Sequence, residues 1–488
     1  MRRLFHVINY VSMRKIINWV KLNIDLMGLT LIGAFLRLRV IVKDDLWYDE
    51  AFTGLLMRVG KEEFWKIVTD DPHPPLYYLM LKGWTTVFGV NDFALRSLPV
   101  LFGILLIVVI YYLVKELFNK ETADIAAFLA AVNPFLIAYS VEARSYMFYG
   151  FMTTLAAYFL VKRKFNLFVI VLVISLFVHY MFAAFLPVLL VYYAFIIIRE
   201  KRGILKGLLR LVPLAAIAVF LYFPVLTDPA NNNLNIDWVK EPDLYNIQQS
   251  ITAYSYGVKS RLSGADELVN VNFLLDEYIL GYGVFIIFIA GILAVLLKDR
   301  KNLDALSKFG FTLMMLFLPM LLLIGYSTYK DKSIYVERYL LPASVFFIIA
   351  LSYILTSLLT WELLGIVVFF YVFTVTRAVT PGYYDGMKPL AQYFKNSESE
   401  VIFTSPIDYI VGKYYLDTDK VKLYDPRNPQ FGYDWPFMSN ARPEDMTTAV
   451  FVSPDETRMT EEFKRPLENL VFGDYSIYIK EDREDETI

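Results

Sequence analysis

Two adjacent acidic residues, Asp49 and Glu50, stand in the segment DDLWYDEAF at residues 44–52, directly after an apolar stretch. A carboxylate pair can bind a divalent cation, or one carboxylate can act as a general base whose pKa is raised by burial and by its negative neighbour. Taken alone, such a pair is more often an ordinary solvated turn. Its chemistry therefore depends on the other polar residues that the fold brings to it.

A second candidate group lies in NPFLIAYSVEARSYMFYG, residues 133–150, where Glu142 and Arg144 occupy a short turn between two apolar runs. Ionisable residues in such a place are costly and are functional suspects. A guanidinium can donate two parallel hydrogen bonds to a phosphate. The alternative interpretation is a structural Glu–Arg pair, or side chains that reach toward lipid head groups.

A third candidate group contains Arg338, in the segment YKDKSIYVERYLLP at residues 329–342. Basic residues directly before an apolar run suit an anionic lipid head group or a phosphate. His179 ends another apolar run and is followed by Tyr180. A lone histidine at a helix end is more often a hydrogen-bonding residue at the membrane interface than a ligand.

Composition predicts the elements that must position these residues. Of the 488 residues, 57% are hydrophobic and 20% are charged, and the hydrophobic residues form runs that approach the roughly 20 residues needed to cross a bilayer. This predicts an all-α polytopic membrane protein. The absence of Cys excludes disulfides, thiolate metal sites and cysteine nucleophiles. We expect about eleven transmembrane helices, near residues 24–42, 94–114, 122–139, 146–161, 165–180, 182–198, 208–226, 278–297, 309–328, 341–358 and 361–379.

Basic residues mark alternate connections between these spans, namely residues 1–21, 115–120, 162–164, 199–210 and 298–308. The positive-inside rule makes this side cytoplasmic. We therefore expect a multi-pass protein of the plasma (cytoplasmic) membrane whose N-terminus is cytoplasmic, with residues 1–21 as a cytoplasmic leader rather than a cleaved signal peptide. The other side receives the first external loop, about 43–93, the turn near 140–145, residues 227–277 and 329–340, and everything after residue 380.

Two domains are predicted, a transmembrane domain at residues 1–379 and a small extracytoplasmic α/β domain at residues 380–488. The tail contains β-like runs at 401–404, 421–424, 448–452 and 475–480, with a helical segment between the first two. In the first external loop, residues 71–89 predict a helix in the interface plane that begins at Pro74 and Pro75 and ends at Gly89. Residues 227–277 form either a mobile lid or a partly helical loop.

Six motifs in order, LWYDEA, HPPLYY, GVNDFALRSLP, NPFLIAYSVEARSYMF, FVHYMFAAF and ERYLLP, give the chain a family resemblance over about residues 24–345. It resembles the GT-C superfamily of integral membrane glycosyltransferases, nearest the branch that includes protein O-mannosyltransferases and the lipid A aminoarabinose transferase. The resemblance implies a donor sugar on a polyprenyl or dolichyl phosphate, such as dolichyl phosphate mannose. It also implies transfer on the extracytoplasmic face with inversion at the anomeric carbon.

The resemblance also assigns roles to residues. Asp49 would be the general base, and Glu50 would position the sugar or acceptor or share a metal. Arg144 and Arg338 would hold the departing lipid phosphate, with a looser claim for Arg96. The sugar or acceptor pocket would be lined by Glu142, His73, Tyr77, Trp47, Tyr48 and His179.

The predicted activity is transfer of a hexosyl or pentosyl group to a lipid, glycan or protein acceptor. The tail is too short for the repeat domain of eukaryotic protein O-mannosyltransferases, which disfavours a protein Ser/Thr acceptor. An Asp-x-Asp metal motif of the oligosaccharyltransferase type is absent, so we expect no obligatory cofactor, while a divalent cation at Asp49 and Glu50 stays an alternative. We expect contacts with membrane lipids and none with nucleic acid.

Two other functional classes are alternatives. A transporter or flippase for a lipid-linked sugar would use the same phosphate-binding arginines without a base. Transporters often carry internal repeats or broken helices at the bilayer midplane, and the sequence predicts neither. The second alternative is a non-catalytic membrane receptor whose tail is the working part.

Overall fold

The structure is a computed structural model that describes residues 23–71, 73–227, 241–260, 267–268, 277–330, 333–378, 386–396, 400–424, 436–440, 450–453, 466–472 and 475–479. The chain divides into two compact units. The first unit comprises Met1–Arg39, Pro99–Val141 and Ser145–Thr380, and the second comprises Val40–Leu98, Glu142–Arg144 and Pro381–Ile488. The predicted leader at residues 1–21 lies outside the described residues.

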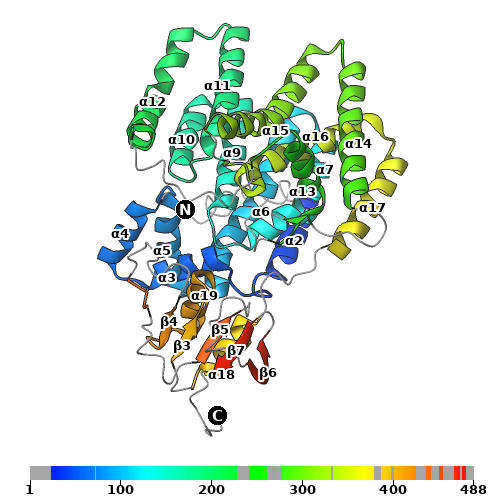
Figure 1. Ribbon diagram of the computed structural model, residues 1–488. Coiled ribbons are helices and arrows are strands. Elements are labelled where there is room, and N and C mark those ends of the chain that lie inside the picture. The colour runs from blue at the N-terminus through cyan, green and yellow to red at the C-terminus, as the bar shows by residue number, and fades with distance from the viewer. Residues whose placement is uncertain are drawn as a thin grey trace, which may run out of the picture. The chain divides into compact units, whose positions relative to one another are not determined.

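The first unit is mostly helical in its described part (Figure 1). In hydrocarbon every backbone N–H and C=O must be satisfied internally, and a helix satisfies them within one segment. Its helices are α2 (Ile24–Leu38), most of α6 (Asp92–Leu117), α7 (Lys120–Val132), α8 (Pro134–Ser140), α9 (Tyr146–Val161), α10 (Phe165–Leu176), α11 (Phe182–Arg199), α12 (Ile204–Thr227), α13 (Tyr245–Tyr256), α14 (Glu277–Lys298), α15 (Leu303–Lys330), the 3₁₀ helix η2 (Glu337–Leu340), α16 (Leu341–Leu358) and α17 (Trp361–Ala378). Strands β1 (Val258–Ser260) and β2 (Glu267–Leu268) pair antiparallel.

The predicted spans all overlap these helices. By length and hydropathy, five helical segments within the described residues can cross a membrane, namely Asp92–Leu117, Phe182–Arg199, Gly281–Lys298, Leu303–Lys330 and Glu337–Leu358. A multi-pass helical membrane protein is therefore confirmed, while the total of eleven spans stays a prediction. The separation of residues 165–180 from 182–198 is also confirmed, because α10 ends at Leu176 and α11 begins at Phe182. In the loop 227–277, α13 confirms the partly helical alternative for the described residues 241–260.

One predicted span, 122–139, is wrong as a continuous helix. Helices α7 and α8 meet at a bend of 56° around Asn133. Pro134 has no N–H, so it cannot donate the helical hydrogen bond to the carbonyl of Ala130. The side chain of Asn133 starts α8 by accepting a hydrogen bond from the Leu136 N–H at 2.9 Å.

A buried arginine in the first unit satisfies the carbonyls at this break. Arg37 of α2 is fully buried. It donates from Nη2 to the Ala130 carbonyl at 3.2 Å and from Nη1 to the Ala131 carbonyl at 3.1 Å. Its Nε donates to Ser140 Oγ at 2.9 Å. Arg37 thus supplies the donors that the broken helix has lost, and links both sides of the break.

The second unit contains helices α3 (Tyr48–Arg58), α4 (Lys61–Asp70), α5 (Leu76–Phe88), α18 (Met387–Phe394) and α19 (Pro406–Leu416), together with the first turns of α6. Its sheet has the order β4-β3-β5-β7-β6 (Figure 1). The strands are β3 (Val401–Phe403), β4 (Val421–Leu423), β5 (Val450–Ser453), β6 (Pro466–Phe472) and β7 (Tyr475–Ile479). β3 runs parallel to β4 and β5, and β7 pairs antiparallel with β5 and β6.

Most predicted elements of this unit are confirmed. The four β-like runs correspond to β3, β4, β5 and β7, and the helix between the first two is α19. α5 ends at Phe88 because Gly89 takes a positive φ of 79°. β6 and α18 were not predicted. That the tail forms a separate extracytoplasmic domain stays a prediction.

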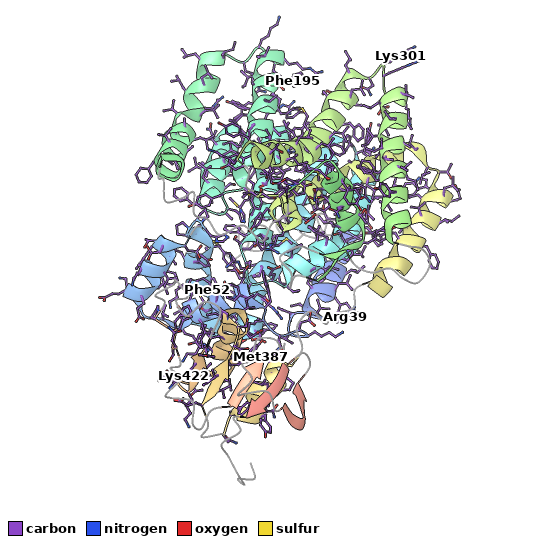
Figure 2. The ribbon with its side chains drawn as sticks, in the orientation of Figure 1. Arg39, Phe52, Phe195, Lys301, Met387 and Lys422 are labelled. Atoms are coloured by element: carbon purple, nitrogen blue, oxygen red, sulfur yellow. The ribbon has the colours of Figure 1, made fainter. Side chains whose placement is uncertain are left out.

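Helix α19 packs against α3, which connects the tail to the first loop within this unit. Gly54 allows the close approach, because a Cβ there would lie 2.4 Å from the Tyr414 ring. Phe52 of α3 meets Phe437 edge to face, with ring centroids 5.9 Å apart. Figure 2 labels Phe52 on α3 and Met387 at the start of α18. α3, which carries the first acidic pair, is therefore held by the tail.

Candidate active site

Asp49 and Glu50 lie in the first turn of α3, where the helix dipole favours negative side chains. The Trp47 N–H donates to Glu50 Oε2 at 3.4 Å and so uses the open N-terminus of the helix. The two neighbours have different surroundings, because the Glu50 side chain is 2% exposed and the Asp49 side chain is 24% exposed. Of this pair, only Asp49 can meet a substrate from solvent.

Glu50 forms a buried two-point ion pair with Arg96. Arg96 Nε donates to Glu50 Oε1 at 2.8 Å, and Nη2 donates to Oε2 at 2.6 Å. The remaining Arg96 N–H groups donate to the carbonyls of Ile41, Asp44 and Asp45 at 3.1, 2.9 and 3.0 Å. These five bonds use all five guanidinium donors. The prediction that Arg96 binds the donor phosphate therefore does not fit this arrangement, in which its role is structural.

Glu50 also holds the turn that carries the second candidate group. Its Oε1 accepts a hydrogen bond from the Ala143 N–H at 2.8 Å. Glu142, next in the turn, is fully buried. Because both Glu50 oxygens are occupied by Arg96 and by backbone N–H groups, this carboxylate is suited to positioning rather than to proton transfer.

Arg144 lies beside Asp49 with four polar neighbours. Its Nε is 3.9 Å from Asp49 Oδ2. Nη1 donates to the Tyr78 hydroxyl at 3.2 Å and to Thr53 Oγ1 at 3.4 Å. Nη2 is 3.3 Å from His73 Nε2. The structure thus brings together three predicted site residues, Asp49, Arg144 and His73, and adds Tyr78 and Thr53.

Asp71 completes this group and was not among the predicted site residues. Its Oδ1 accepts hydrogen bonds from the His73 backbone N–H at 2.7 Å and from His73 Nδ1 at 2.8 Å. Burial alone would raise the pKa of Asp71, but its interactions with His73, together with the charge of Arg144, outweigh burial and lower that pKa below the usual value. The sequence signal for this residue was the Asp-x-His spacing at 71–73, since residues two apart in a turn can bond each other.

Three aromatic residues predicted for the pocket also lie in this unit. Tyr77 and Trp47 are buried, and Tyr48 is half-buried. Tyr77 meets Tyr78 edge to face with centroids 6.1 Å apart. The Tyr77 hydroxyl makes no hydrogen bond to any residue that the structure describes. Burial raises the pKa of Tyr77, so this hydroxyl keeps its proton and can both donate and accept.

Arg338 and His179 belong to the first unit. Both are buried, at 4% and 3% exposure. His179 stacks on Tyr149 with centroids 4.9 Å apart, and its ring lies 5.8 Å from that of Tyr339. The Arg338 guanidinium lies 5.7 Å from the Tyr339 ring centroid. That Arg338 and His179 act together with Asp49 stays a prediction.

A divalent cation at Asp49 and Glu50 stays an untested alternative, and such an ion would have to compete with Arg96 for the Glu50 carboxylate. The Glu50 carboxylate is already neutralised by Arg96, and both its oxygens are hydrogen-bonded. The described part of the chain contains no group of three His, Asp or Glu side chains that could hold a metal ion. The chemistry available at Asp49 itself is proton acceptance by a partly exposed carboxylate beside a guanidinium.

Comparison with known proteins gives one family match. A family model described as dolichyl-phosphate-mannose-protein mannosyltransferase matches residues 72–227. A curated relative, "Putative mannosyltransferase YkcB" of Bacillus subtilis (strain 168), is 28% identical over 267 residues, which are 50% of this chain. The matched region spans 36% of the length of that relative.

Solved structures show the same fold. ArnT from Cupriavidus metallidurans bound to undecaprenyl phosphate has a TM-score of 0.54 and 12% identity, covering 94% of this chain and 98% of that chain. The apo form of the same protein has a TM-score of 0.55 and 12% identity, covering 95% and 98%. With the family match, these findings confirm the resemblance to GT-C superfamily glycosyltransferases near the mannosyltransferase and ArnT branch.

Proposed function

We propose that this chain, which resembles the GT-C superfamily, is an inverting glycosyltransferase that moves a monosaccharide from a polyprenyl or dolichyl phosphate to an extracytoplasmic acceptor. The description of the matched family model supports a lipid-phosphate sugar donor. The ArnT structure of the same fold is bound to undecaprenyl phosphate, which supports the same donor class. The acceptor is a lipid, a glycan or a protein.

The observation that carries the proposal is the placement of Asp49 at the start of α3. Its carboxylate is partly exposed and lies 3.9 Å from Arg144. Glu50, the adjacent acid, is buried and bound to Arg96. Two neighbouring acids thus have different tasks, one open to a substrate and one built into the scaffold.

In the proposed reaction the acceptor hydroxyl gives its proton to Asp49 and its oxygen attacks the anomeric carbon. The bond from that carbon to the phosphate oxygen breaks, and the lipid phosphate leaves with the electron pair. A general base of this kind typically contributes about 10²–10⁴-fold to the rate. Cationic donors near the departing phosphate supply a further part, a role that we assign to Arg338 and Arg144.

The sugar pocket is proposed to include Tyr77. Its buried hydroxyl makes no hydrogen bond to the residues that the structure describes. A sugar hydroxyl could supply that hydrogen-bond partner. Trp47 and Tyr48, beside Asp49 in sequence, offer ring faces for a sugar. Glu142 lies in the turn before Arg144, where its carbonyl accepts from the Arg144 N–H at 2.7 Å, and His73 lies against Arg144 with Nε2 3.3 Å from Nη2; both stay candidates for the pocket.

The membrane arrangement is proposed to follow the charge pattern. The eleven helical segments span the membrane with the N-terminus cytoplasmic. The first loop and the α/β tail are extracytoplasmic, where a lipid-linked donor is presented.

Turnover of a lipid-linked sugar tests this function. The purified protein, supplied with a radiolabelled polyprenyl-phosphate sugar and an acceptor fraction, is expected to release polyprenyl phosphate. Asp49→Asn is expected to lower that release by about 10²–10⁴-fold and to leave donor binding unchanged. Asp70→Asn, at the exposed end of α4, is the matched control and should retain activity. Unimpaired transfer by Asp49→Asn would overturn the role of Asp49.

The transporter alternative gives a different result in the same assay. In sealed vesicles, a flippase would move the intact lipid-linked sugar between leaflets without releasing polyprenyl phosphate. Movement of intact donor with no release would favour that alternative.

A further inference from the structure

We infer that Asp71 is a positioning residue that fixes the Arg144 guanidinium against Asp49 through two arms, His73 and Tyr78. The inference rests on the proposed function for its kinetic consequence, but its geometry stands by itself. Among the described residues, the Asp71 side chain hydrogen-bonds to His73 and Tyr78, and its negative charge also attracts the Arg144 guanidinium.

The first arm runs through the imidazole of His73. Nδ1 lies 2.8 Å from Asp71 Oδ1, and a carboxylate can only accept, so the proton sits on Nδ1. In this tautomer Nε2 carries a lone pair. Arg144 Nη2 lies 3.3 Å away and donates to it. Asp71 therefore chooses the tautomer that makes His73 an acceptor for Arg144.

The second arm runs through the phenol of Tyr78. Its hydroxyl donates to Asp71 Oδ2 at 3.5 Å, the longest hydrogen bond of the two arms. The same oxygen accepts from Arg144 Nη1 at 3.2 Å. The two arms close a ring, Asp71–His73–Arg144–Tyr78, in which both arms donate from Arg144 toward the Asp71 carboxylate. Both terminal nitrogens of Arg144 are held, and this leaves Nε facing Asp49.

Burial makes the position of Arg144 depend on these protein partners. Tyr78 is 2% exposed and the Asp71 side chain 12% exposed, so water cannot easily replace a lost partner. Thr53, fully buried, braces the same guanidinium, and its hydroxyl donates to the Asp49 carbonyl at 2.7 Å. Removing Asp71 would let the imidazole adopt the other tautomer, with an N–H facing the Arg144 N–H groups.

The kinetic test uses Asp71→Leu, which keeps a similar volume and removes both acceptor oxygens. We expect kcat for sugar transfer to fall by about 10²-fold, because a small misplacement of a catalytic group has that effect, while KM for the donor changes much less. In the Arg144→Met background, adding Asp71→Leu should cost nothing further, since there is no guanidinium left to orient. Losses that multiply in the double variant would overturn the inference.

A second readout does not need activity. The chain has three His residues, so the ¹⁵N signals of His73 in lipid vesicles can be assigned with a His73→Gln variant. In the full chain His73 should be protonated on Nδ1 and bare on Nε2. Asp71→Leu should shift it toward the Nε2–H form, and Asp70→Asn should not. If Asp71→Leu fails to fold, Asp71→Ala replaces it, since it also removes both acceptor oxygens.

The two readouts separate the inference from the function. A wild-type His73 that is protonated on Nε2, or a His73 tautomer that does not change in Asp71→Leu, would overturn the inference. A tautomer that follows Asp71 in a protein that transfers no sugar would uphold the ring and reject the proposed function.

Discussion

At the scale of single residues, the site separates two adjacent acids by what surrounds them. Asp49 is 24% exposed and lies beside Arg144, whereas Glu50 is nearly buried and receives hydrogen bonds from Arg96 and two backbone N–H groups. A carboxylate whose oxygens already accept these hydrogen bonds cannot readily take a substrate proton. Glu50 instead fixes the α3 start and the turn 142–144, so we expect its effect on the proposed reaction to be geometric.

Glu50→Gln should therefore be a stability variant. It leaves the Arg96 guanidinium buried without its counter-charge, and breaking a buried pair in this way costs about 3–5 kcal/mol. We expect a large fall in Tm, measured by thermal unfolding in detergent, with a smaller effect on donor turnover in the protein that stays folded. Asp49→Asn should show the reverse pattern. Equal Tm values for wild type and Glu50→Gln would contradict the structural role.

The sequence predicted part of this site and missed part. It named Asp49, His73 and Arg144, because they stand in separate polar motifs that interrupt apolar sequence. The sequence could not show that Arg96 donates all five of its hydrogen bonds to Glu50 and to three backbone carbonyls, because those partners come from tertiary packing. Asp71 was overlooked for the same reason, since its second arm depends on how α5 turns Tyr78.

At the scale of elements, the break between α7 and α8 shows how a polar side chain repairs a helix. Pro134 ends α7 by removing one N–H, and its position in the motif NPF is a local signal that the prediction of a continuous span did not use. Periodicity nevertheless favoured one apolar span, because both segments are hydrophobic. The hydrogen-bond donors that replace the missing N–H come from Arg37 of α2, which is 93 residues from Ala130 in sequence. That pairing is not visible in local sequence.

Arg37→Met tests this repair. The change leaves the carbonyls of Ala130 and Ala131 unsatisfied in a buried setting, at about 1–3 kcal/mol for each lost partner. We expect a lower Tm and a lower yield of folded protein. Arg37→Lys should restore both only in part, because its single ammonium group cannot reach all the partners of the guanidinium. Arg39→Met is the control, because Arg39 is exposed and lies two residues after Arg37. It should leave the Tm unchanged. A wild-type Tm for Arg37→Met would remove the proposed role.

At the scale of the whole molecule, the second unit is assembled from distant stretches of the chain. Residues 40–98, the turn 142–144 and the tail meet there. Apolar contact between α3 and α19 is accompanied by polar links, in which the Tyr415 hydroxyl accepts from the Leu46 N–H at 2.8 Å and donates to Asp92 at 2.9 Å. Four of the five tail strands that the structure describes were predicted from local sequence, but the packing of α19 on α3 of the first loop was not.

Lys388 is the residue that tests this assembly. Its Nζ lies 2.9 Å from Asp92 Oδ2 and 3.5 Å from Asp45 Oδ1, and it donates to the Asp44 carbonyl at 3.0 Å. Burial raises the pKa of Asp45, and the charge of Lys388 opposes that rise. Lys388→Met should therefore raise the pKa of Asp45 further and destabilise the unit.

The sign of the pH effect follows from this direction. A carboxyl whose folded pKa is raised contributes stability below its unfolded pKa of about 3.9 and loses it as pH rises through the folded pKa. The Tm deficit of Lys388→Met against wild type should thus be larger at pH 8 than at pH 5. Lys395→Met, exposed near the end of α18, should show no deficit at either pH. Proteolysis of residues 40–98 should accelerate only in the Lys388 variant, because the tail holds this first loop through Lys388. A deficit that does not vary with pH would show that Asp45 is not the group that Lys388 neutralises.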